Sequence, residues 1–452
     1  MQQTIIDINA LDMDGRGVGH LTNEDGSQGK VVFVEGALPG EQVSFHSYRK
    51  KPKWEAATMT ALHRESSLRV KPKCSYFGIC GGCAMQHLEP SAQVAMKQRV
   101  LEDNLWHLSK LKSEFVLRPI YGPTWSYRHR ARISVRNVIK KGGVLVGFHE
   151  KSSSFVSDMK TCEILPPHVS AMLVPLRRLI GSLSIIDHLP QIELAIGEDD
   201  GGKKNTVMVL RVMEALSTED ETKLKVFADE HEVEWWLQPK GPDTAYPYYP
   251  PQSSLRYTLP EFGIDIPFKP TDFTQVNHQI NRVLVAQVLR LLDAQPDDRV
   301  ADLFCGLGNF TLPIATIVKE VVGIEGSTAL TERAAENARI NKLVNKTSFH
   351  CRNLFAATTE DFIASGKFDR MLIDPPREGA LEVCKAITGL GEQYPHLKPK
   401  RIVYVSCNPA TLARDAGVLV NLGSYRLKQA GVINMFPHTA HVESIALFDF
   451  DA

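Results

Sequence analysis

A cysteine near the carboxyl end of the chain has the surroundings of a nucleophile. Cys407 directly follows a predicted strand at 401–406 and precedes a turn, whereas a structural cysteine more often lies within a strand. A thiolate in such a position can attack an electron-poor carbon and form a covalent intermediate. Because the thiolate is the reactive form, this chemistry requires a polar pocket that lowers the pKa of the cysteine.

Further along the chain than Cys407, three residues are candidates for the general base that such a reaction needs. His438, His441 and Glu443 all lie within one short segment. Glu443 is the first choice, with the two histidines as competitors. A lone glutamate at the start of a strand is more often a surface residue, so spacing alone does not decide among the three.

A glycine-rich loop is the third part of the chemistry. The segment 302–310, Asp-Leu-Phe-Cys-Gly-Leu-Gly-Asn-Phe, follows a predicted strand and opens a helical run. Its glycines allow a ligand to approach closely at the carboxyl end of the strand, where open α/β sheets bind ligands. Glu325 ends the next strand and can accept both ribose hydroxyls of an adenosine. A dinucleotide and S-adenosylmethionine both fit this arrangement.

The segment Asp374-Pro375-Pro376-Arg377 separates these two ligands. It ends a later strand and resembles the fourth motif of S-adenosylmethionine-dependent methyltransferases that act on nucleobases. Uracil C5 is a poor nucleophile, so its methylation requires activation. A thiolate that adds to C6 creates an enolate at C5, which attacks the methyl sulfonium, and a base then removes the C5 proton. Together the motifs indicate this reaction.

Four further cysteines have the pattern of a metal centre. Cys74, Cys80 and Cys83 form C-x5-C-x2-C, and Cys162 lies alone downstream. Structural zinc usually takes two pairs of closely spaced ligands, whereas a tight trio with a distant fourth cysteine suits a cuboidal iron–sulfur cluster. We therefore favour a 4Fe–4S cluster over zinc, with a structural rather than a redox role. A disulfide framework is disfavoured in a reducing compartment.

Two predicted domains precede the catalytic motifs. Residues 1–66 contain short strands with glycine-rich turns at 14–19 and 36–41, which is typical of a small barrel. Residues 67–260 mix helical and extended stretches, which predicts a central α+β domain that holds the cysteines. Its Pro- and Tyr-rich segment 241–252 is expected to be a connector.

Residues 261–452 alternate predicted strands and helices. The strands are expected at 299–304, 320–325, 368–374 and 401–406, with a helix at 328–343. Such alternation predicts a mostly parallel, Rossmann-like α/β sheet. The catalytic motifs then lie at strand ends.

Taken together, the motifs resemble the RNA uracil-5-methyltransferase family over nearly the whole chain, and in particular its bacterial members that act on uracil 1939 of 23S ribosomal RNA. Residues 15–19 and 33–41 look like a TRAM domain, a small RNA-binding barrel, and residues 273–277 match the F-x-Q-x-N motif. Residues 406–415 and 436–443 match the nucleophile and base signatures of that family.

Carried over by position, the resemblance implies Cys407 as nucleophile and Glu443 as proton acceptor. Contacts with S-adenosylmethionine are implied for six residues: Gln275, Phe304, Asn309, Glu325, Asn353 and Asp374. The implied ligands of the 4Fe–4S cluster are Cys74, Cys80, Cys83 and Cys162.

The net charge hides two basic stretches. The 52 Lys and Arg residues balance 52 Asp and Glu residues over the 452-residue chain, yet 46–73 and 124–151 are each strongly basic and 193–234 is acidic. Aromatic side chains beside the arginines of 124–151 favour a nucleic-acid partner. We therefore expect 23S ribosomal RNA as substrate. We expect a cytoplasmic protein without a membrane segment, because no secretory signal or long apolar run is present. We expect a monomer, because no strongly apolar surface helix stands out.

Two other functions remain open on these motifs. Transfer-RNA uridine methylation uses the same catalytic motifs. The more distant alternative is a non-catalytic RNA-binding or ribosome-assembly protein with a vestigial donor pocket, and Cys407, Glu443 and Asp374 argue against it.

Overall fold

The computed structural model describes residues 4–451, and the chain divides into two compact units. The first unit contains the chain up to residue 100 together with 148–157 and 436–441. The second contains 101–147, 158–435 and the chain from 442 onwards. Both units are therefore assembled from separate stretches of the sequence.

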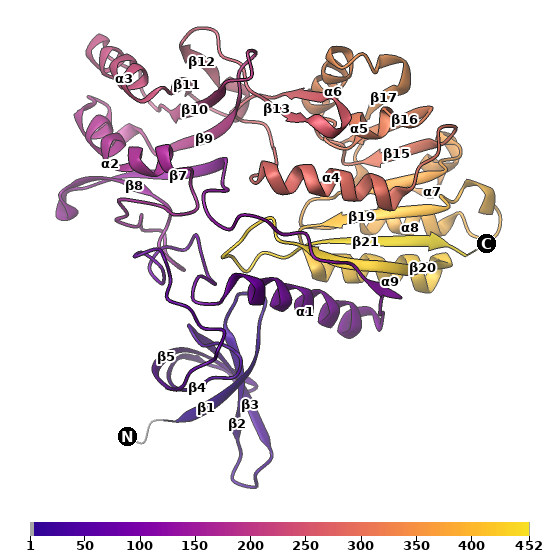
Figure 1. The fold of residues 1–452 in the computed structure, drawn as a ribbon, viewed down its shortest axis with the longest axis horizontal. Coiled ribbons are helices and arrows are strands. Elements are labelled where there is room, and N and C mark those ends of the chain that lie inside the picture. The colour runs from indigo at the N-terminus through magenta and orange to yellow at the C-terminus, as the bar shows by residue number, and fades with distance from the viewer. Residues whose placement is uncertain (1–3, 452) are drawn as a thin grey trace. The chain divides into compact units, whose positions relative to one another are not determined.

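A closed five-stranded barrel forms the amino-terminal part of the first unit, drawn in indigo in Figure 1. Its strands, in sheet order, are β1 (Ile5–Leu11), β2 (Gly17–Thr22), β3 (Gln28–Glu35), β5 (Trp54–Arg64) and β4 (Gln42–Lys50). Alternate apolar side chains such as Ile8, Val32 and Val34 are buried inside it. This confirms the predicted barrel.

The glycines of segment 14–19 differ from the predicted turn. Gly15 does turn, with a φ of +75°, but Gly17 and Gly19 lie within β2. A Cβ at Gly17 would lie 2.8 Å from Ile8, and one at Gly19 would lie 2.6 Å from the carbonyl oxygen of Asp7. These two glycines are required by close packing of β2 on β1.

A mixed eight-stranded sheet occupies the middle of the chain and confirms the α+β prediction. Six strands follow the order β12 (Tyr246–Tyr249), β11 (Glu234–Gln238), β10 (Lys204–Arg211), β9 (Gln191–Glu198), β13 (Arg256–Leu259) and β14 (Ile264–Pro267). β7 (Arg130–Val138) pairs with β9 and β8 (Gly143–Gly147), and the sheet packs against α2 (Pro167–Ser182) and α3 (Thr218–His231). The predicted connector at 241–252 is wrong in part, because β12 pairs with β11.

The second eight-stranded sheet carries the catalytic motifs. Its order is β17 (Thr347–Cys351), β16 (Glu320–Glu325), β15 (Arg299–Leu303), β18 (Arg370–Ile373), β19 (Arg401–Ser406), β21 (Glu443–Phe450), β20 (Tyr425–Ile433) and β6 (Phe115–Val116). The first five strands are parallel, and β21 is antiparallel to its neighbours. Their centres are buried and apolar, as expected of a sheet covered on both faces.

Seven helices complete the description: α1 (Pro90–Ser109), α4 (His278–Leu292), α5 (Thr311–Ala315), α6 (Thr328–Ile340), α7 (Thr359–Ser365), α8 (Leu381–Gly389) and α9 (Pro409–Gly423). In the carboxyl-terminal sheet, α4 packs on β18 and β19, and α9 packs on β19 and β20 (Figure 1). Within residues 4–451, none of the helices combines the length and apolarity needed to cross a bilayer.

Candidate active site

One edge of the carboxyl-terminal sheet gathers the candidate catalytic groups. Glu325 ends β16, Asp374 follows β18, and Cys407 follows β19, so all three lie at the carboxyl ends of parallel strands. β21 runs the other way and begins at this edge with Glu443. Ser444 pairs with Ser406, so Glu443, which precedes Ser444, and Cys407, which follows Ser406, are each adjacent to a residue of this pair.

The backbone around Cys407 is fixed by its polar neighbours. The Asn408 side chain caps α9 by accepting a hydrogen bond from the Ala410 amide at 3.0 Å. The Asn408 amide donates to the Ser406 hydroxyl at 3.1 Å. The Asn408 side-chain amide also donates to the Arg377 carbonyl at 3.2 Å, which ties this turn to the loop that follows Asp374. Cys407 thus lies beside a turn that hydrogen bonds hold in place.

The electrostatic surroundings of Cys407 differ from the expectation of a lowered pKa. Burial of the half-buried thiol, together with the charges of Glu443 and Asp374, raises the pKa of Cys407 to about 12. The Arg377 guanidinium opposes this shift, but it does so less than the causes that raise the pKa. The prediction of a lowered pKa was wrong for the ligand-free protein, chiefly because the thiol is buried and also because of the two carboxylates.

Of the three candidate bases, Glu443 is the one whose charge acts on Cys407. His438 belongs to the first unit, where it is buried and its Nδ1 contacts the Gln93 side-chain nitrogen at 3.1 Å. His441 also belongs to that unit, and its ring packs on Phe436. Glu443 therefore stays the first choice for the general base.

Two buried carboxyl groups extend the acidic character of this edge. Burial raises the pKa of Asp302 to about 7, and burial together with Glu443 holds the pKa of Asp374 well above its ordinary range. The Thr311 hydroxyl donates to one oxygen of Asp302, while its Oδ1 is buried without a hydrogen-bond partner among the described residues. Such a pocket fits a cationic ligand, and S-adenosylmethionine carries positive charge on its sulfonium and amino groups.

The glycine-rich loop after β15 is shaped by left-handed backbone. Phe304, Gly306 and Gly308 have φ values of +64°, +54° and +92°. The Gly306 amide donates to Glu325 Oε2 at 3.2 Å, while Glu325 Oε1 accepts from the Gly326 amide at 2.8 Å. The Phe304 ring packs on Phe355 with centroids 5.7 Å apart. Glu325 thus holds this loop against the end of β16.

The other implied contacts of S-adenosylmethionine are placed less directly. Gln275 is half-buried in the loop that leads to α4. The Asn309 side chain is already engaged, since its Oδ1 accepts from Tyr257 at 3.0 Å and from Asn281 at 2.8 Å. Asn353 is exposed, and its side chain accepts a hydrogen bond from the Phe355 amide. Asn309 is therefore placed to position neighbours rather than to offer a free amide.

Three of the four implied cluster ligands share one loop in the first unit. Cys74, Cys80 and Cys83 lie among turns, and the Gly82 amide donates to Cys80 Sγ at 3.4 Å. Cys162 is buried in the second unit. The four cysteines supply the thiol donors that an iron–sulfur site needs. Within the described part of the chain, no three His, Cys, Asp or Glu side chains already form a metal site.

The basic stretch 124–151 is partly neutralised within the fold. Arg132 forms an ion pair with Glu193 at 3.0 Å, and Glu193 belongs to the acidic stretch 193–234. On the barrel, by contrast, Arg49, Lys51 and Lys53 are exposed. The acidic and basic stretches are thus not entirely separate in space.

Sequence reasoning missed three residues at this edge. Arg377 and Asp302 lie within motifs that the sequence analysis singled out, but it predicted no role for them. Arg377 acts to lower the pKa of Cys407, and Asp302 acts to raise the pKa of Asp374. Both effects depend on proximity in the fold. Asp415 is fully buried and accepts hydrogen bonds from the Tyr404 hydroxyl and the Ala380 amide, each at 2.7 Å. Its place within the nucleophile signature was the only signal available.

Comparison with known proteins agrees with this geometry. A family model described as tRNA (Uracil-5-)-methyltransferase matches residues 267–449. The 23S rRNA (uracil(1939)-C(5))-methyltransferase RlmD of Cupriavidus necator is 65% identical over 442 residues, which cover 98% of this chain and 99% of the relative. The protein of the same description from Ralstonia pickettii is 64% identical over 449 residues, with 99% of each chain covered.

A solved structure supports the fold. The tRNA (uracil-54, C5)-methyltransferase of Pyrococcus abyssi, in complex with S-adenosyl-L-homocysteine, superposes with a TM-score of 0.72 at 22% identity, covering 98% of this chain and 100% of the other. From the full-length relatives, the chain belongs to the S-adenosylmethionine-dependent RNA (uracil-5-)-methyltransferases and, within them, to the 23S rRNA (uracil(1939)-C(5))-methyltransferase RlmD family.

Proposed function

We propose that this protein methylates C5 of uridine 1939 in 23S ribosomal RNA, with Cys407 as nucleophile and Glu443 as general base. The observation that carries the proposal is the pairing of Ser406 with Ser444, because it puts both groups at one edge beside Asp374. The names of the full-length relatives support this substrate. We propose that the barrel is a TRAM domain. Its exposed basic side chains support an RNA partner.

The first step is addition of Cys407 to uracil. The target uridine must leave its stack to expose C5 and C6. Cys407 Sγ bonds to C6 as the thiol loses its proton, and the electrons of the C5–C6 double bond become available at C5. Bound S-adenosylmethionine supplies the methyl group, and it also brings a positive charge close to the carboxylates at this edge of the sheet. We propose that five residues hold it: Asp302, Asp374, Glu325, Phe304 and Gln275.

The second half of the reaction restores the aromatic base. Glu443 removes the C5 proton, and the electrons of the C5–H bond re-form the double bond as the C6–Sγ bond breaks. Cys407 leaves as a thiolate and takes up a proton. The products are 5-methyluridine in RNA, the demethylated donor and one released proton.

Methylation of defined RNAs tests this proposal. Purified protein is incubated with labelled S-adenosylmethionine and either 23S ribosomal RNA or transfer RNA, and the modified base is mapped. We expect 5-methyluridine at position 1939. We also expect Cys407→Ala to reduce the rate by at least roughly 1,000-fold, while Cys351→Ala, at an exposed cysteine, leaves it unchanged. Activity that survives in Cys407→Ala contradicts the covalent route.

Transfer-RNA methylation is the second candidate, because the matching family model and the solved structure both carry that description. The same mapping experiment separates the two. A methylated transfer-RNA uridine, with 23S RNA left unmodified, would replace our substrate assignment. The non-catalytic alternative has no support, since the chain belongs to an enzyme family.

We also propose that Cys74, Cys80, Cys83 and Cys162 hold a 4Fe–4S cluster with a structural role. The four thiols are the support for this proposal, together with an amide that donates to Cys80 Sγ. Iron and sulfide analysis of anaerobically purified protein should give about four of each per chain. One zinc per chain without sulfide contradicts the cluster.

A further inference from the structure

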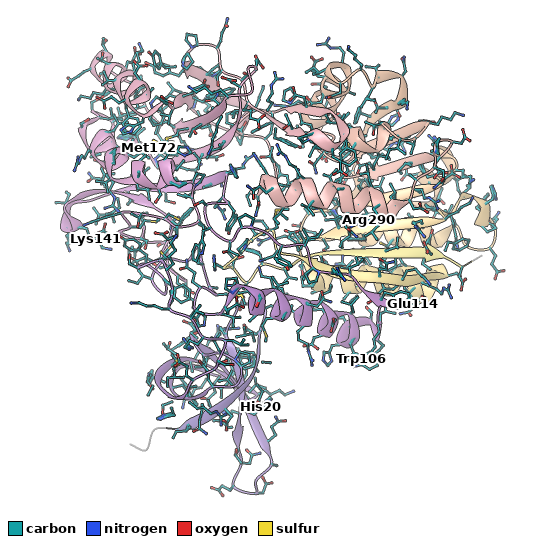
Figure 2. The ribbon with its side chains drawn as sticks, in the orientation of Figure 1. His20, Trp106, Glu114, Lys141, Met172 and Arg290 are labelled. Atoms are coloured by element: carbon teal, nitrogen blue, oxygen red, sulfur yellow. The ribbon has the colours of Figure 1, made fainter. Side chains whose placement is uncertain are left out.

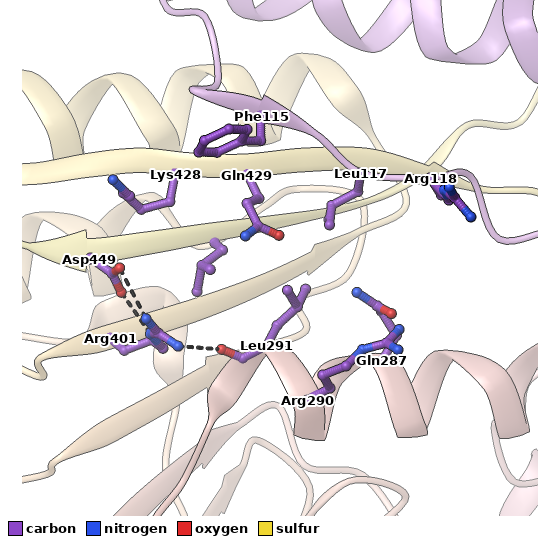
Figure 3. A pocket seen from close by; sticks show the side chains of 11 residues that line it. Phe115, Leu117, Arg118, Gln287, Arg290, Leu291, Arg401, Lys428, Gln429 and Asp449 are labelled. Carbon is purple, nitrogen blue, oxygen red and sulfur yellow. Dashed lines mark hydrogen bonds and ion pairs between the residues drawn. The ribbon is translucent and has the colours of Figure 1, made fainter.

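A groove of about 510 Å³ lies on the carboxyl-terminal sheet, away from the catalytic edge. Arg401 lines it at the start of β19, and Cys407 follows the end of the same strand. At about 3.3 Å per strand residue, the two residues lie roughly 20 Å apart. Figure 3 shows the side chains that line it, among them Phe115, Arg118, Gln287, Arg290, Arg401 and Gln429.

The groove has an excess of positive charge. Arg401 is paired with Asp449 at 2.7 Å, and Lys428 is paired with Glu114. Arg118 and Arg290 are different, since neither guanidinium group forms a hydrogen bond or ion pair with any residue between 4 and 451. Two uncompensated guanidinium groups therefore line the groove. Guanidinium groups bind phosphate through two parallel hydrogen bonds.

The remaining lining suits a nucleic acid better than a simple anion. Phe115 is 65% exposed on β6, the terminal strand in the sheet order, and pairs with Gln429 of β20. Side-chain amides of Gln287 and Gln429 add hydrogen-bonding groups. Exposed rings, amides and arginines together are the groups that bind single-stranded RNA by stacking and phosphate contacts.

The chain that leads into the groove continues this character. Trp106 is 43% exposed, and the amino groups of Lys110 and Lys112 lie 5.4 and 5.0 Å from the centroid of its ring. Figure 2 labels Trp106, Glu114 and Arg290 in this part of the second unit. The segment 106–118 thus contains two large aromatic side chains, Trp106 and Phe115, and several basic ones, with Glu114 its one acid.

We propose that this groove binds the sugar–phosphate backbone of a single-stranded stretch of the RNA substrate, with Arg118 and Arg290 on phosphates and Phe115 against a base. The inference rests on the proposed function for the existence of an RNA substrate. It adds a substrate-binding surface away from the reacting uridine. An acidic protein segment would satisfy the arginines but would leave the exposed ring and the amides unused.

Binding measurements on a matched set of variants test the groove. The double variant Arg118→Gln/Arg290→Gln is compared with Arg339→Gln/Lys385→Gln, which removes two exposed cations from α6 and α8. The dissociation constant for a 23S RNA fragment that contains uridine 1939 is measured over a range of salt concentrations. We expect the groove variant to bind roughly 5- to 20-fold more weakly, with a salt slope lower by about 1.4.

Kinetics and a third variant separate binding from folding. In the groove variant, KM for RNA should rise while kcat and the affinity for S-adenosylmethionine stay unchanged. Phe115→Ala should weaken RNA binding without a change of salt slope, because stacking releases no counterions. A groove variant that loses cofactor affinity together with RNA binding contradicts a local RNA contact.

Three further outcomes distinguish failure of this inference from failure of the proposed function. If the wild type methylates RNA and the groove variant behaves like its control, the inference is wrong and the proposed function stands. If the groove variant loses binding only to polyglutamate, the surface is a protein-binding one and the inference is wrong. If the wild type methylates no RNA, the proposed function itself fails.

Discussion

At the scale of single residues, the acidic pocket both restrains the nucleophile and suits a cationic donor. The carboxylates that attract positive charge also raise the pKa of Cys407 to about 12. The cysteine is therefore a thiol at neutral pH in the ligand-free protein, and positive charge bound beside it favours the thiolate. In the proposed reaction, a bound cation would therefore make Cys407 more reactive.

This account predicts how fast Cys407 reacts with iodoacetamide. The rate should climb as pH rises towards the pKa of about 12, because more thiolate is then present. Glu443→Gln removes one charge that raises this pKa, so the labelling rate at pH 8 should increase, about tenfold for each pKa unit lost. Peptide mass spectrometry measures the rate, with exposed Cys351 as internal standard. Equal rates in both proteins would show that Glu443 does not act on the thiol.

Asp302 gives a second, independent pH dependence. Its pKa is raised from 3.8 to about 7 by burial, so folding favours the protonated form. Its contribution to stability is full below about pH 4 and is lost as pH rises to about 7. Asp302→Asn should abolish that loss, which amounts to at most about 4 kcal/mol.

Urea unfolding at pH 5 and pH 8 measures the effect of Asp302. The exposed Asp297→Asn variant is the control and should follow the wild type at both pH values. Parallel behaviour of Asp302→Asn and wild type would mean that Asp302 is ionised in the folded protein over the whole range.

The residues of the site could be predicted only as far as motifs carry local information. Cys407 stood out through its position after a strand, whereas the role of Glu443 was implied mainly by the resemblance, and both residues adjoin the pair Ser406–Ser444. The direction of the Cys407 pKa shift was wrong because the burial of the thiol depends on the fold, and because Glu443, 36 residues further along the chain, acts on it only through the position of β21. The burial of Asp302 likewise depends on its neighbours in the fold.

At the scale of elements, Asp415 joins three parts of the catalytic edge. It lies on α9, and it accepts hydrogen bonds from Tyr404 of β19 and from Ala380 in the loop after Asp374. Arg414 donates to its other oxygen at 2.7 Å. This fully buried carboxylate therefore holds the loop of Asp374 against the helix that follows Cys407.

Tyr404→Phe tests this connection with a small change. It removes one donor from a buried carboxylate, so the free energy of unfolding should fall by about 1–2 kcal/mol. Urea denaturation measures the change, and Tyr394→Phe, at a half-buried tyrosine outside the network, should stay within about 0.5 kcal/mol of the wild type. A neutral Tyr404→Phe would show that the hydroxyl contributes no net stability.

The elements themselves were predictable where the sequence pattern was long enough. β16 and β19 match the strands expected at 320–325 and 401–406, because buried parallel strands are nearly continuous apolar runs. The two residues of β6 are too few to show a periodicity. β12 was not predicted as a strand because its Pro- and Tyr-rich sequence is typical of a connector. Gly17 and Gly19 were predicted to form a turn. Close packing between strands requires glycine just as a turn does, so the sequence alone does not distinguish the two.

At the scale of the whole molecule, the zero net charge still allows binding to a polyanion. Lys51 and Lys53 are exposed on the barrel, so Lys51→Gln/Lys53→Gln should lower the salt slope of RNA binding by about 1.4 if both contact phosphates. Glu219→Gln/Glu221→Gln, within the acidic stretch, is the control and should change the slope little. Filter binding over a salt series measures both. An unchanged slope in the lysine variant would remove the barrel from the RNA interface.

The covalent intermediate is the most direct test of the account. Glu443→Gln is incubated with S-adenosylmethionine and 23S ribosomal RNA, and the product is analysed on denaturing gels and by mass spectrometry after nuclease and protease digestion. We predict a stable adduct in which Cys407 is bonded to C6 of a C5-methylated uridine at position 1939, absent from the Glu443→Gln/Cys407→Ala protein. The absence of an adduct, or an adduct that persists without Cys407, would contradict the account.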